Sequence, residues 1–316
     1  MSCWRAKHMN QSNNNAKFAF FYMLSLVALI FMALSAGMIV FQIINKLIKD
    51  IIEQYSGSFN SGSLKFAISA LIISTPIYYF TARQIYKNLY TGALSKDSGI
   101  RKWLTYFILL VSSVVMIGWL IGTINTFLDG DLTLKFALKS LTAVAIAGAV
   151  FGFYFYDIKR EEVAGKKDMI IKTFFWTSLI IILAVFIGSL FIVESPRETR
   201  LRKIDEAVLN RFNSIDNAIN MYFADMEKMP EDLNKISDYS NYLSKDDLAD
   251  PETDKQFNYN VLSEKKYELC GDFRTSNLDQ EDIRAEYLKE RWPHDSGYQC
   301  LMQLVNVREG LETLDR

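Results

Sequence analysis

The stretch FAFFYMLSLVALIFMALSAGMIVFQII, from Phe18 to Ile44, decides the fold, because it holds 27 residues and no charged side chain. An α-helix needs about 20 apolar residues to cross roughly 30 Å of hydrocarbon. The stretch therefore predicts a membrane-spanning helix. It is too long for the apolar region of a secretory signal peptide, so we expect it to stay attached to the chain.

Four more apolar segments follow, and with the first they give the predicted spans 18–44, 64–82, 103–128, 138–156 and 173–193. The second is the weakest, because its apolar core, Phe66–Phe80, is short and contains Pro76. It reaches spanning length if Lys65 and Arg83 extend to the two membrane interfaces. A re-entrant or surface helix is the alternative.

The overall net charge of −1 hides two halves of opposite sign. Residues 1–196 carry 18 Lys/Arg and 10 Asp/Glu, whereas residues 197–316 carry 17 Lys/Arg and 26 Asp/Glu. Nearly all long apolar runs lie in the first half, which excludes a single soluble globule and a wholly disordered chain. The soluble half is acidic and would be repelled by phosphates, so we expect no nucleic-acid partner.

The distribution of Lys and Arg between the loops indicates the orientation. With five spans and a cytoplasmic N-terminus, the cytoplasmic pieces carry 13 Lys/Arg and the outer loops carry 5. This obeys the positive-inside rule, and the count inverts if the second segment does not span. We therefore expect a multi-pass protein of a bacterial inner membrane, with a disordered cytoplasmic tail at 1–17 and residues 194–316 outside.

No span carries a charged residue in its central part, which disfavours a transporter or a pump. The third and fourth spans contain small residues at a spacing of four, which lets helix backbones approach closely. We expect these glycines to pack within the bundle, and the alternative is a dimer interface: Gly118, Gly122, Gly148 and Gly152.

The acidic half begins with a predicted amphipathic helix. Ser195 is the expected N-cap, Pro196 the first helical residue and Glu198 the partner in a capping box. An apolar stripe then recurs every three or four residues until the helix ends before Pro230. The stripe consists of Leu201, Ile204, Val208, Leu209, Phe212, Ile215, Ile219, Tyr222, Phe223 and Met226.

Three strands are predicted after this helix. Residues 257–261 alternate in period two, 267–273 form the second arm of a hairpin, and 298–307 form a third strand. A short helix near 233–248 and a partly helical acidic segment at 277–290 lie between them. The fold class is thus a membrane α-helical bundle of five spans, followed by a small α+β domain with one long helix and a three-stranded antiparallel sheet.

Three short stretches of the acidic half resemble the globular domains of type IV pilins and type II secretion pseudopilins. They are IDNAINMYFADMEKMP from Ile215 to Pro230, DPETDKQFNY from Asp250 to Tyr259, and YELC from Tyr267 to Cys270. The resemblance covers about 194–305 and implies a role in a pilus or a secretion system. No pilin leader precedes the fifth span, so we expect no processing before Phe174. The complete layout resembles an uncharacterised bacterial membrane-protein family, which implies no activity.

A search for catalytic and cofactor motifs gives no enzyme prediction and no expected cofactor. The only histidines are His8 and His294, and phosphate-binding loops, nucleophile elbows and HExxH motifs are missing from the sequence. Hard carboxylates cluster around an Asp-Pro turn, and they are a weak calcium candidate against the alternative of a solvated loop. These carboxylates are Asp246, Asp247, Asp250, Glu252 and Asp254.

The three cysteines are Cys3, Cys270 and Cys300. Cys3 lies in the predicted cytoplasmic tail, where we expect a free thiol. Cys270 and Cys300 lie in neighbouring predicted strands of the half expected outside, where disulfides persist. We predict a Cys270–Cys300 bridge, and two buried thiols are the alternative.

These observations favour a non-enzymatic membrane protein whose outer domain binds envelope proteins or copies of itself. A transporter or channel component is the second hypothesis, and a polar cavity between the spans would favour it. The bilayer itself is the one partner that the composition indicates directly.

Reporter fusions at Lys96 and at the C-terminus test the orientation. The 13-to-5 distribution of Lys and Arg predicts that the Lys96 fusion reports cytoplasm and the C-terminal fusion reports the outside. A cytoplasmic C-terminus would contradict the arrangement of five spans.

Overall fold

The computed structural model describes residues 2–48, 57–94, 97–160, 164–165, 168–240, 243–278 and 283–305, with the backbone alone described for 2–16 and 283–286. The chain divides into two compact units, Met1–Val193 and Glu194–Arg316.

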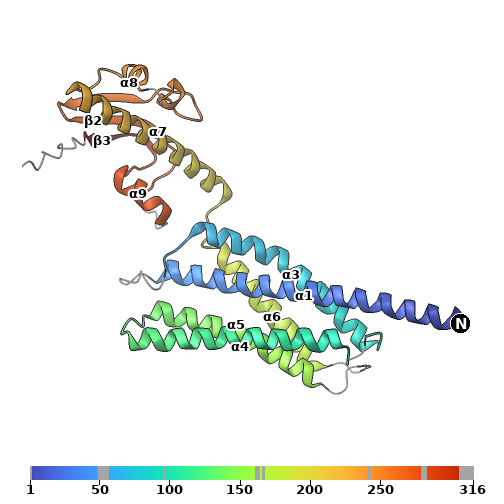
Figure 1. The fold of residues 1–316 in the computed structure, drawn as a ribbon. Helices are drawn as coiled ribbons and strands as arrows, with labels where there is room; N and C mark the ends of the chain where they lie inside the picture. Colours follow the sequence, from blue (N-terminus) through green and yellow to red (C-terminus); the bar gives the residue numbers. More distant parts are fainter. Residues whose placement is uncertain are drawn as a thin grey trace, which may run out of the picture. The chain divides into compact units, whose positions relative to one another are not determined.

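Five long helices make up the membrane unit, and each contains a window apolar enough to cross a bilayer. They are α1 (Ser2–Leu47), α3 (Ser61–Tyr90), α4 (Gly99–Leu128), α5 (Leu134–Lys159) and α6 (Met169–Leu190). α1 lies beside α3, and α4 forms an antiparallel hairpin with α5 (Figure 1). The chain therefore has the helices of a multi-pass membrane protein.

Local sequence sets where these helices begin. Asn60, Ser98, Thr133 and Asp168 are the N-caps of α3, α4, α5 and α6, and each side chain accepts a hydrogen bond from a backbone N–H in the first turn. Pro76 lies inside α3 without ending it, as membrane helices tolerate where neighbouring groups satisfy the freed carbonyl.

The helices are longer than the apolar segments that predict them. α3 spans 30 residues, so the segment that the sequence predicts least securely lies within one long continuous helix. α1 begins at Ser2, and the expectation of a disordered tail at 1–17 is therefore wrong. The long apolar helix that follows supplies the nucleus, and extending a helix costs far less than nucleating one.

α1 and α3 hold the centre of the membrane unit. Their buried residues are apolar over most of their length: Ala28, Leu29, Met32, Ala36, Ile39, Leu64, Ala67 and Leu71. Large apolar side chains on the outer surfaces of α4 and α6 are exposed, for example Leu110, Ile121 and Ile181. Apolar side chains on the outer surface are expected for a protein in a bilayer, because lipid chains cover them.

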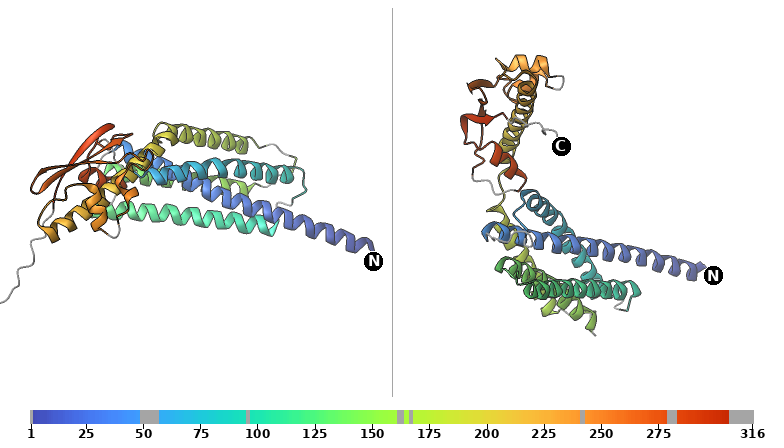
Figure 2. Two further views of the ribbon diagram at one scale, coloured as in Figure 1. Left: turned by 90° about the horizontal axis from the view of Figure 1, so that it is seen from above. Right: turned by 60° about the vertical axis from the view of Figure 1, so that its left-hand side comes forward.

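The C-terminal unit contains α7 (Pro196–Met226), α8 (Leu233–Tyr239), a short 3-10 helix (Lys245–Leu248), β1 (Asn258–Ser263), β2 (Lys266–Phe273), α9 (Ile283–Arg291) and β3 (Gly297–Leu304). The strands form one antiparallel sheet in the order β1-β2-β3. They lie side by side in the left view of Figure 2, and α7 crosses one face of the sheet in Figure 1. The predicted fold class is confirmed.

Phe212 of α7 is the centre of the core of this unit. Its ring makes edge contacts with Phe257, Phe273 and Trp292, at centroid distances of 4.9, 6.0 and 5.5 Å. A Cβ on Gly271 of β2 would lie 3.2 Å from the Phe212 ring, so this glycine permits the close approach of helix and sheet.

Two buried carboxylates of α7 lie within the predicted apolar face. Asp205 accepts hydrogen bonds from the backbone N–H groups of Arg274 and Thr275, at 2.9 and 2.7 Å. Asp216 accepts from the Tyr267 hydroxyl and pairs with Arg291. Burial raises the pKa of Tyr267, and so does the charge of Asp216. Both carboxylates therefore tie α7 to the sheet and its loops.

The disulfide between Cys270 and Cys300 is present, and the two residues are direct partners in the β2–β3 register. Replacing both by Ala should lower the free energy of unfolding of this unit by about 2–4 kcal/mol, because the bridge restricts the unfolded chain. Chemical denaturation of wild type with and without reductant provides the comparison. In unreduced, denatured protein, thiol labelling should modify Cys3 alone, and labelling of Cys270 or Cys300 would contradict the bridge.

Candidate functional site

A cluster of buried charges lies at one end of the membrane unit. Arg101, in the first turn of α4, donates to the Asp157 carboxylate and to the Asp157 carbonyl oxygen, both at 2.8 Å. Arg160, the C-cap of α5, pairs with the other carboxylate oxygen of Asp157. The side chains of Arg101 and Arg160 are only 3% and 6% exposed. One carboxylate thus pairs with two buried guanidinium groups.

Asp168 extends this cluster to α6 and α3. Its carboxylate caps α6 at the Ile170 N–H (2.9 Å), accepts from the Tyr156 hydroxyl (3.0 Å) and lies 3.7 Å from Arg160 Nη1. The ring of Tyr86, in α3, lies 5.6 Å from the Arg160 guanidinium carbon. Burial opposes the charge on Arg160, but Asp157 holds the pKa of that guanidinium above its ordinary value. Four helices are therefore joined at this end of the unit.

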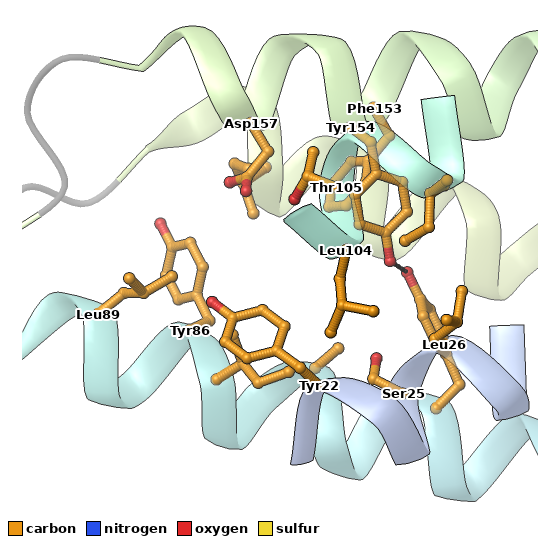
Figure 3. Close-up of a pocket in the computed structure, with 15 residues that line it drawn as sticks. Tyr22, Ser25, Leu26, Tyr86, Leu89, Leu104, Thr105, Phe153, Tyr154 and Asp157 are labelled. Atoms are coloured by element: carbon orange, nitrogen blue, oxygen red, sulfur yellow. Dashed lines mark hydrogen bonds between the residues drawn. The ribbon is translucent and has the colours of Figure 1, made fainter. Parts of the chain in front are cut away.

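A cavity of about 70 Å³ lies next to the cluster. Figure 3 shows side chains of α1, α3, α4 and α5 around it, among them Tyr22, Ser25, Thr105, Tyr154 and Asp157. The Tyr154 hydroxyl lies 3.5 Å from that of Tyr78. The Tyr22 hydroxyl is buried and has no hydrogen-bond partner among the described residues. A cavity of this size has room for several water molecules, which would supply the missing partners.

The chemistry of this site is limited by its charges. Asp157 is bound by two guanidinium groups, so it would have to lose both ion pairs to act as a base or to bind a cation. The remaining polar groups drawn around the cavity in Figure 3 are hydroxyls of Tyr, Ser and Thr. The arrangement can hold water and fix the helices, and it offers no nucleophile activated by a neighbouring base.

The carboxylates proposed as a calcium site do not converge on one point. Arg274 binds Asp250 through two nitrogens, at 2.6 and 2.8 Å, and also reaches Glu252 at 3.1 Å. Burial opposes ionisation of Asp250, but Arg274 and the backbone N–H groups of Glu252 and Thr253 lower its pKa to about 2. Asp247 caps the 3-10 helix at Ser244, and Asp246 and Asp254 are exposed. Asp250 and Glu252 are therefore already paired with Arg274, which disfavours a cation there, and the calcium site stays a prediction.

The only cluster of potential metal ligands among the described residues is Glu268, Cys270 and Cys300. Both of its cysteines are in the disulfide, so their sulfurs are not thiolate ligands. The second histidine, His294, is buried, stacks on Phe273 at 4.0 Å and has its pKa lowered by burial.

The four glycines with helical spacing differ in their surroundings. A Cβ on Gly122 would meet Phe136 at 3.9 Å, and one on Gly148 would meet Met116 at 3.8 Å, so both lie at ordinary contacts between α4 and α5. A Cβ on Gly118 or Gly152 would meet nothing within 4 Å. Packing within the unit thus involves two of the four, and a dimer role for the other two stays a prediction.

The charged cluster is the part of the site that sequence reasoning missed. The sequence places Arg101 and Arg160 among the loop charges, where they count only toward orientation. Two sequence features could have indicated the cluster. Asp157 and Arg160 are three residues apart at a helix end, and acidic and basic residues border the apolar segments on the same predicted side of the membrane.

A second candidate surface lies on the sheet of the C-terminal unit. β3 is an edge strand, and its outward side chains Tyr298, Met302 and Leu304 are 48%, 58% and 67% exposed. Asn258 of β1 donates to the Tyr298 hydroxyl at 2.6 Å, which holds this ring across the sheet. We call these three side chains the β3 stripe.

Comparison with known proteins finds a similarity over part of the membrane unit. Residues 19–154 match a domain of unknown function, DUF5671. No curated protein and no solved structure matches the chain significantly. The pilin likeness therefore has only the short sequence motifs behind it, and the family match carries no activity with it.

Replacing Asp157 by Asn tests the charged cluster. An amide cannot neutralise two buried guanidinium groups, so the free energy of unfolding should fall by about 3–5 kcal/mol. The matched control is Asp97→Asn, because Asp97 pairs with Lys102 in a far more exposed position and should contribute at most about 1 kcal/mol. Denaturant unfolding in detergent measures both, and equal losses would show that the cluster carries no special stability.

Proposed function

We propose that the protein is a non-enzymatic membrane protein that presents its C-terminal unit for docking on the extracytoplasmic side of a bacterial inner membrane. Five helices able to span, an excess of Lys and Arg on the predicted cytoplasmic side and a compact second unit support this proposal. The sequence likeness to pilins and pseudopilins favours partners in the envelope, in a pilus or in a secretion system.

The observation that carries the proposal is the edge of β3, which pairs with no further strand among the described residues. An edge strand exposes backbone N–H and C=O groups, and soluble proteins usually protect such edges with charged residues or proline. Residues 297–304 read GYQCLMQL, with neither. The β3 stripe adds exposed apolar side chains on alternate residues of the same strand. Strand addition by a partner uses this combination of backbone pairing and alternating side-chain contacts.

The charge of the unit indicates which partner segment would fit. Residues 197–316 have a net charge of −9. In the register, Met302 lies opposite Glu268 and Tyr298 lies opposite Asp272, so carboxylates border the β3 stripe on β2. The partner segment would therefore be extended, with apolar residues alternating with Lys or Arg. A second copy of this acidic unit would meet like charge.

One observation favours transport as a second candidate function. The cavity beside Asp157 and Tyr22, which has a carboxylate and several hydroxyls in a mainly apolar lining, lies between the helices of the membrane unit. A transport path would need it to continue along the bundle, but the neighbouring interior from Ala28 to Ile39 is apolar and buried. The docking proposal therefore accounts for more of the structure.

Site-specific photocrosslinking in native membranes tests the docking proposal. A photoreactive residue at Tyr298 or Leu304 should crosslink to another protein, whereas the same residue at Met226, which is 47% exposed at the end of α7, should not. With the crosslinker at Leu304, Met302→Glu should abolish the adduct, because it places a charge in the apolar contact. Met302→Leu should preserve it.

Three results would contradict the proposal. Crosslinking at Met226 as strong as at Leu304 would mean that contact is unspecific. No adduct at either β3 position would mean that the edge is unoccupied. An adduct containing only a second copy of the chain would replace the envelope partner by self-association.

A further inference from the structure

An apolar groove runs between α1, α4 and α5 in the membrane unit. Its volume is about 380 Å³, within the range of small-molecule sites. Almost all of its lining is hydrophobic, and α1 contributes Leu29, Ala33 and Phe41, α4 contributes Trp119, and α5 contributes Ala143 and Ala147. All of these residues lie in helices that can span a membrane, so the medium that the groove faces is lipid.

Two lysines continue the groove at the N-terminal end of α5. Residues 135, 139, 143, 147 and 150 follow one another at spacings of three or four, so Lys135 and Lys139 lie on the same face of α5 as the groove. The Lys139 ammonium lies 6.0 Å from the centre of the Phe41 ring, and Phe41 also stacks edge-on with Trp119 at 5.4 Å. The Lys139 ammonium thus stands beside Phe41, which lines the groove, and Lys135 lies one helical turn before Lys139.

Both lysines are buried. Lys135 is 1% exposed and Lys139 is 7% exposed. Within the part of the chain that the structure describes, the Lys135 ammonium has no hydrogen-bond partner. Two like charges one helical turn apart repel each other, and a buried ammonium without an acceptor is costly. An anion brought next to Lys135 and Lys139 would relieve both penalties.

We propose that this groove binds an anionic phospholipid. Its phosphate lies at Lys135 and Lys139, and one acyl chain fills the groove along Ala143 and Ala147. The two charges occupy the first two turns of α5, where a membrane helix meets the headgroup layer, and the apolar lining begins in the next turn. An amphiphile with one charged end and one long apolar end matches this order of residues.

Native mass spectrometry of the delipidated full-length protein in detergent tests the site. The probes are a phosphatidylglycerol and a phosphatidylcholine with identical acyl chains. The wild type should retain the anionic lipid at least about tenfold more strongly, because two lysines near a phosphate each add attraction. The double variant Lys135→Gln/Lys139→Gln should lose this preference. Lys102→Gln, which removes an exposed cation at the opposite end of the bundle, should keep it.

A second pair of variants tests the acyl chain. Ala147→Phe places a ring in the groove and should reduce retention of both lipids, whereas Ala149→Phe, on an exposed position of the same helix, should change neither. This pair stands without the lysine variants if the latter fail to fold, and gel filtration together with the unfolding midpoint reports folding for each protein.

Several outcomes would overturn the proposal. Equal retention of both lipids by the wild type would remove the role of charge, and so would an unchanged preference in the double lysine variant. Retention unaffected by Ala147→Phe would remove the groove. Displacement of the lipid by an excess of inorganic phosphate alone would assign the lysines to a free anion.

Discussion

The structure of the membrane unit depends on one constraint, which is that a backbone polar group in hydrocarbon must find its hydrogen-bond partner within the protein. Five helices meet it, and several hydroxyls inside them donate to carbonyls of the preceding turn, as Ser112 does to Ile108 and Thr123 does to Trp119. If all five helices span, their odd number would put the two ends of this unit on opposite sides of a bilayer. The proposed exposure of the C-terminal unit follows from this count.

The two ends of the bundle treat buried charge differently. At one end Asp157 pairs with Arg101 and Arg160, and the second carboxylate, Asp168, brings these four charges into balance. At the other end Lys135 and Lys139 are buried, and the Lys135 ammonium has no hydrogen-bond partner among the described residues. The ion pairs around Asp157 connect the helices to one another, whereas the buried lysines of α5 are suited to binding an anionic ligand. Both groups of charges lie at helix ends, which agrees with the lack of charged residues in the central parts of the spans.

Patterns repeated along the chain made most of the fold predictable. The apolar segments, the periodicity from Leu201 to Met226 and the alternation in the strands each use local spacing, and the pairing of Cys270 with Cys300 follows from neighbouring strands. The charged cluster was not predictable in this way, because Arg101 and Asp157 are 56 residues apart. The pairing of Arg274 with Asp250, 24 residues away, was not predictable for the same reason. Long-range ion pairs leave no periodic signal in the sequence.

The account depends most on α3, because a surface position for it would make the number of spans even and reverse the side of the C-terminal unit. Hydrogen–deuterium exchange of the protein in lipid nanodiscs measures this directly. Peptides from 64–82 should exchange as slowly as those from 103–128, because neither backbone would be reached by water. Exchange of 64–82 as fast as that of the exposed turn at 91–93 would contradict the five-span arrangement.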